Sequence, residues 1–81
     1  MIIVSRVKVQ SGAVELRIVP GESGDWRWSI QMTGGRSLER GTSSSKTAAE
    51  EDVERAFEER LQRAGLFRQF PRAFQWTEKL A

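Results

Sequence analysis

Residues 26–32 decide the fold of this chain, and they read W-R-W-S-I-Q-M. Apolar residues occupy every second position, at Trp26, Trp28, Ile30 and Met32. This two-residue period predicts a β-strand with one buried face. Each tryptophan buries about 150–250 Å² when it lies in a core. We therefore expect Trp26 and Trp28 to lie beneath a helix, whereas the alternative is an exposed pair that stacks on nucleic-acid bases.

Three other segments also predict strands. Residues 1–10 are rich in β-branched side chains, residues 14–18 alternate, and a short strand is expected over 36–40 with Leu38 facing inward. Ser11-Gly12 and the stretch 33–35 are turn sequences, so neighbouring strands should pair as hairpins in sequence order.

A helix is expected over residues 47–64. Thr47 and Glu50 fit a capping box, with Ser45 as a rival cap, and Gly65 suits the position after the last turn. Apolar residues form one face of this helix: Ala49, Val53, Ala56, Phe57, Leu61 and Ala64. Arg60 also falls on that face, where it would extend to solvent, pair with Glu78 or contact a partner.

The C-terminal residues 66–81 contain Phe67, Phe70, Phe74 and Trp76, so this tail should pack against something apolar. A short helix from Pro71 is expected, and a strand over 73–77 is the alternative. The sequence leaves open whether residues 66–81 pack on their own domain or on a neighbouring molecule.

These elements predict one α+β domain over residues 1–81. Its antiparallel sheet would have three or four strands, with one main amphipathic helix packed on one face and the aromatic C-terminal tail closing the core.

The composition excludes several classes of site. The 81 residues include no Cys and no His, which removes zinc fingers and the Cys–His and Ser–His–Asp catalytic groups. Carboxylates at 50–52 and 58–59 share one helix, and hydroxyls at 43–45 lie beside Lys46, but a solvated face and helix capping explain them. We expect a cytoplasmic protein with no membrane segment, no metal, no cofactor and no enzymatic activity.

Charge is distributed in blocks, although the net charge is only +2. Residues 1–46 carry +3, residues 47–59 carry −5 and residues 60–81 carry +4. If the tryptophans point inward, cationic side chains of three strands point outward together, which suits a phosphate backbone. This predicted basic sheet face consists of Arg6, Lys8, Arg17 and Arg27. The alternative is an ordinary solvated sheet face.

The acidic block predicts a second surface, on the helix. This acidic helix face consists of Glu51, Glu54, Glu58 and Glu59. It would dock on a basic groove of a protein partner, and the alternative is a solvated face stabilised by the pairs Glu51–Arg55 and Glu59–Arg63.

Residues 26–57 combine Trp26-x-Trp28, Gly34-Gly35, Gly41, a serine-rich stretch and an amphipathic helix. In these features the chain resembles YegP-like bacterial domains of unknown function. The resemblance implies a strand–strand–helix fold. In size the chain is also similar to stand-alone phage or mobile-element inhibitors, including anti-CRISPR proteins.

Together these features predict a non-catalytic module that acts through a protein partner. The alternative function is a DNA- or RNA-binding module that uses the basic sheet face. A homodimer is a further expectation, because small cores gain from shared burial.

Overall fold

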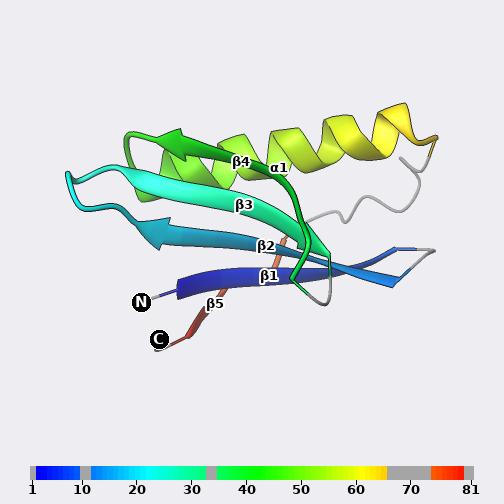
Figure 1. The fold of residues 1–81 in the computed structure, drawn as a ribbon, viewed down its shortest axis with the longest axis horizontal. Coiled ribbons are helices and arrows are strands. Elements are labelled where there is room, and N and C mark those ends of the chain that lie inside the picture. Colours follow the sequence, from blue (N-terminus) through cyan, green and yellow to red (C-terminus); the bar gives the residue numbers. More distant parts are fainter. Residues whose placement is uncertain (1, 10–11, 33–34, 66–73, 80–81) are drawn as a thin grey trace.

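The computed structural model describes residues 2–9, 12–32, 35–65 and 74–79. It contains a sheet and one long helix, drawn in Figure 1. In chain order the elements are β1 (Ile2–Val9), β2 (Gly12–Pro20), β3 (Trp26–Met32), β4 (Ser37–Ser43), α1 (Lys46–Arg63) and β5 (Thr77–Lys79).

The five strands form one antiparallel sheet in the order β4-β3-β2-β1-β5, and α1 lies along one of its faces (Figure 1). The predicted α+β class is therefore confirmed, with one strand more than expected. The first four strands are neighbours in both sequence and sheet, as hairpins require. No helix in the described residues is long and apolar enough to cross a bilayer.

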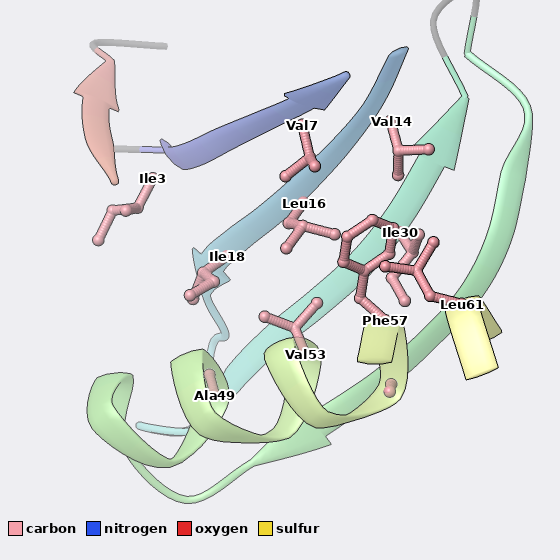
Figure 2. Packing of buried hydrophobic residues seen from close by; sticks show 11 residues of the cluster. Ile3, Val7, Val14, Leu16, Ile18, Ile30, Ala49, Val53, Phe57 and Leu61 are labelled. Atoms are coloured by element: carbon pink, nitrogen blue, oxygen red, sulfur yellow. The ribbon is translucent and has the colours of Figure 1, made fainter. Parts of the chain in front are cut away.

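The core lies between the sheet and α1, and Figure 2 shows its side chains meeting from both layers. Leu16, Ile18, Ile30 and Val53 are its largest fully buried residues. The predicted apolar face of the helix supplies Ala49, Val53, Ala56, Phe57 and Leu61. Trp26 and Trp28 pack against this core but are only partly buried, so they lie at its margin.

Trp28 explains how β4 continues through Gly41, beyond the strand expected over 36–40. Trp28 and Gly41 are direct partners across β3 and β4. A Cβ atom at Gly41 would lie 2.4 Å from Cζ2 of Trp28, so the indole occupies the space that any side chain there would need. The absence of a side chain at residue 41 thus lets the strand pass beneath the ring.

The two ends of α1 follow the sequence signals in part. Ser45 is the N-cap, and its hydroxyl accepts a hydrogen bond from the Ala48 amide at 3.1 Å. The capping box that starts at Thr47 is wrong, because the helix begins at Lys46 and Thr47 lies within its first turn. At the other end Gly65 has the expected positive φ of 73°.

Residues 74–79 pack on their own chain, first against α1 and then, over the last three residues, at the edge of the sheet. Thr77–Lys79 pairs with β1, so the expected helix is wrong for this described part of the tail. The Phe74 ring lies edge-on to Phe57, with centroids 6.1 Å apart, and stacks on Trp76 at 6.5 Å. Phe67 and Phe70 lie outside the described residues.

Arg60 joins α1 to β4 rather than to the tail. Its Nε donates to Glu39 Oε1 at 3.1 Å, and Nη2 donates to the Leu38 carbonyl at 2.6 Å. Pairing with Glu78, one of the three alternatives for Arg60, is therefore wrong. Glu39 is the direct partner of buried Ile30, so the Glu39 side chain projects from the helix side of the sheet, where Arg60 contacts it.

Candidate functional site

The face of the sheet opposite α1 is the candidate site, and we call it the uncovered face. Side chains alternate along a strand, so the neighbours of buried Leu16, Ile18 and Ile30 point away from the helix. The uncovered face carries Arg6, Glu15, Arg17, Arg27, Ser29, Gln31, Arg40 and Thr42. These side chains are polar and predominantly basic, with four arginines and one carboxylate. The same register also places Val4, which is buried, and Val19 on this face.

Glu15 is bonded to two of these arginines. Its Oε1 accepts from Arg17 Nε at 2.6 Å, and its Oε2 accepts from Arg6 Nε at 3.1 Å. Its side chain is only 18% exposed. Burial raises the pKa of Glu15, but the hydrogen bonds and charges of Arg17 and Arg6 outweigh it, so that the pKa falls below its usual value.

Arg17, Ser29 and Arg40 form a row across three neighbouring strands. Arg17 of β2 is paired with Ser29 of β3, and Ser29 is paired with Arg40 of β4. Directly paired residues of antiparallel strands project from the same face. The row therefore places a small hydroxyl side chain between two guanidinium groups.

Arg40 is a member of this face that the sequence did not predict. With Leu38 inward and strict alternation, Arg40 would point toward the helix. The pairing instead shifts between Ile30 and Gln31, so that Leu38 is an extra residue, and Arg40 aligns with Ser29. This β-bulge moves Arg40 to the uncovered face. The only signal in the sequence is the presence of the polar residues Glu39 and Arg40 beside Leu38, which does not locate a bulge.

Described residues line three hollows of the uncovered face. The largest of these three has a volume of about 620 Å³, and its lining combines the polar residues Arg17, Arg27, Ser29, Gln31, Arg40 and Thr42 with Val19 and Trp28. A second, of about 380 Å³, adjoins Arg6 and Glu15, and a third, of about 270 Å³, lies between Arg6 and residues of the tail.

Of the predicted basic sheet face, Arg6, Arg17 and Arg27 are brought together on one side of the sheet. The side chain of Lys8 lies outside the described part of the chain. Arg6 and Arg17 share Glu15, whereas Arg27 and Arg40 form no ion pair within the described residues. Positive charge is thus least compensated around the largest hollow.

One of the four carboxylates of the acidic helix face is already bonded within the chain. Glu51, Glu58 and Glu59 are exposed. Glu54 is half-buried, and its Oε2 accepts a hydrogen bond from Trp76 Nε1 at 2.9 Å. Its carboxylate thus binds the tail, a contact between residues 22 positions apart that no local pattern reveals.

Arg55 and Arg63 do not form the ion pairs with Glu51 and Glu59 that the spacing along the helix suggests. Arg55 pairs with Asp52 at 3.3 Å rather than with Glu51, and Arg63 Nε donates to the Glu59 carbonyl at 3.4 Å rather than to its carboxylate. In the described part of the chain, no three acidic side chains lie close enough together to hold a metal ion.

Comparison with family models, curated proteins and solved structures finds no match for this chain. The resemblance to YegP-like domains therefore stays a prediction.

Proposed function

We propose that this protein is a non-catalytic module that binds the phosphate backbone of nucleic acid on its uncovered face. The observation that supports this proposal is the gathering of Arg6, Arg17, Arg27 and Arg40, from four strands, on one face of the sheet, where Glu15 pairs with only two of them. The shared hollow would bring phosphate oxygens close to several guanidinium groups at once. Guanidinium groups suit this role because their fixed N–H donors match phosphate oxygens.

The character of the face specifies the kind of binding. The strand register places no aromatic side chain among the described residues of the uncovered face. Trp28 lines the hollow, but it is partly buried and packs against the core with its ring over Gly41, so we expect phosphate contacts rather than base stacking there. Contacts to phosphate carry no sequence information by themselves. We therefore expect binding that is insensitive to base sequence and sensitive to salt. Four phosphate contacts correspond to a slope of about −3 to −4 in log K against log salt.

A protein partner on the acidic helix face is the second candidate. Exposed Glu51, Glu58 and Glu59 favour it, since within the described residues none of their carboxylates forms an ion pair. We rank it second because Glu54 is bound to Trp76, and because Lys46 and Arg55 compensate neighbouring acids of the same helix.

The test is fluorescence anisotropy with labelled duplex DNA, single-stranded DNA and RNA over a range of salt concentrations. The variant Arg27→Ala/Arg40→Ala should lose about tenfold or more in affinity at low salt, because it removes two phosphate contacts. Neither arginine forms an ion pair in the described residues, so folding should be retained. The matched control, Glu51→Ala/Glu58→Ala, removes two exposed charges from the opposite side and should not weaken binding. The absence of binding to all three probes at low salt would falsify the proposal.

A further inference from the structure

We propose that Arg17, Ser29 and Arg40 form a subsite for one phosphate group on the uncovered face. The proposal deepens the proposed function, on which it rests for the source of the phosphate, a nucleic-acid backbone. It distinguishes this row, in which two guanidinium groups would hold the same phosphate, from the other cations of the same face, each of which would contact a phosphate singly.

The spacing of the row allows Arg17 and Arg40 to contact one anion from opposite sides. Neighbouring strands lie about 4.8 Å apart, so the backbones at Arg17 and Arg40 are separated by about 10 Å with Ser29 midway. Because serine is short, it leaves a notch between two long side chains that extend into the same hollow. An anion in this notch would receive guanidinium N–H groups from both sides.

Ser29 supplies a donor at the base of the notch. Its Oγ accepts a hydrogen bond from Gln31 Nε2 at 3.4 Å. A hydroxyl that accepts through a lone pair still carries its own proton for donation. Gln31 therefore leaves the Ser29 O–H able to donate to a phosphate oxygen.

Glu15 acts as a positioning residue for Arg17. It binds Nε at 2.6 Å, while the two terminal nitrogens of the guanidinium make no hydrogen bond to another side chain in the described part of the chain. An arginine that is already fixed loses less conformational freedom when it binds its ligand. Arg6 holds the second oxygen of Glu15, which fixes the carboxylate in turn.

Arg27 is the matched control within the same hollow. It is exposed, lies on β3 like Ser29, and is paired with Val19 and Thr42 rather than with another arginine. Removing Arg27 changes the net charge as much as removing Arg40 does, but leaves the row intact. A larger loss of affinity for Arg40→Ala than for Arg27→Ala therefore measures the contribution of the row and not that of the net charge.

The experiment has two arms. In the first, inorganic phosphate is titrated against the full chain and followed by amide and arginine Nε NMR signals. We expect the largest shifts at Arg17, Ser29 and Arg40. In the second, oligonucleotide affinity is measured for Arg40→Ala and Arg27→Ala, with losses of about tenfold and about threefold respectively.

Each outcome separates the subsite from the proposed function. If phosphate shifts the row but no oligonucleotide binds, the subsite is supported and the proposed function fails. If oligonucleotides bind and Arg27→Ala costs as much as Arg40→Ala, the proposed function stands and the subsite is overturned. Phosphate shifts spread evenly over the face would also overturn it.

Glu15→Gln tests the positioning role by the sign of its effect. The substitution removes a negative charge beside the site, which by attraction alone would strengthen phosphate binding. Loss of the fixed Arg17 predicts weaker binding instead, together with a change in the Arg17 Nε signal. An increase in phosphate affinity would contradict the positioning role.

Discussion

Glu15 joins two strands through their side chains. Arg6 is its direct partner on β1, and Arg17 lies two residues further along β2, so one carboxylate fixes arginines from both strands. The pair distances of 3.1 and 2.6 Å, together with partial burial, make the charged form of Glu15 part of the native state.

This arrangement predicts a loss of stability in acid. Because the folded pKa of Glu15 lies below the ordinary value of 4.5, its contribution to the free energy of unfolding is fully present above pH 4.5. The contribution is lost as the pH falls below 4.5 and through the lowered folded value. Glu15→Gln should therefore show a smaller decrease in stability over this range than the wild type.

Urea unfolding at several pH values measures this effect. Glu22→Gln is the control, because Glu22 is an exposed carboxylate in a loop and forms no ion pair in the described residues. It should keep the acid dependence of the wild type. The interpretation would be wrong if both variants reduced that dependence equally.

At the scale of elements, the described tail is attached to α1 by one polar and one aromatic contact. Trp76 donates to Glu54 at 2.9 Å, and Phe74 packs on Phe57. We expect Trp76→Phe and Glu54→Gln each to destabilise the fold by about 1 kcal/mol, since Trp76→Phe removes the hydrogen bond and Glu54→Gln replaces its charged acceptor with a neutral amide oxygen. The double variant should cost less than the sum of the two, because both substitutions act on the same bond.

Urea denaturation of the two single variants and the double variant supplies this cycle. Glu51→Gln is the control on the same helix, and its exposed side chain should change stability by less than about 0.5 kcal/mol. Strict additivity of Trp76→Phe and Glu54→Gln would show that the hydrogen bond does not couple β5 to α1.

The elements also show what the sequence can and cannot predict. Strand β3 is found over the residues that its period indicated, and α1 buries the apolar face expected apart from Ala64, which is the exposed C-cap, because each periodicity is a local property. β5 has only three residues, too few for a period, and its extended form comes from pairing with β1. Its partner strand is some 75 residues away along the chain, so no local signal marks it.

The residues of the candidate site likewise divide into those that local sequence predicts and those that it does not. Arg6, Arg17 and Arg27 follow from alternation along single strands. The position of Arg40 depends on a bulge, and the engagement of Glu54 depends on a tail that folds back across the helix. Both are consequences of pairing between distant segments, which override the local pattern.

At the scale of the whole molecule, the sheet separates two surfaces of opposite character. Four arginines lie on the uncovered face, and exposed Glu51, Glu58 and Glu59 lie on the helix packed against the other face. The small net charge therefore hides a strong asymmetry. A polyanion that approaches the chain would be turned toward the uncovered face before contact, which favours association at low salt.

The contacts of residues 74–79 with β1 and α1 also predict that the chain unfolds as one unit. These residues are held by backbone pairing, by the ring of Phe57 and by Glu54, all within one molecule. In a variant with Trp26→Phe and Trp28→Phe, only Trp76 reports by fluorescence. Its transition in urea should coincide with that of far-UV circular dichroism, which follows the sheet and helix. Loss of the Trp76 signal at lower urea would show that the tail detaches first. A midpoint that rises with protein concentration would show that a second copy holds the tail, because only an intermolecular contact makes stability depend on concentration.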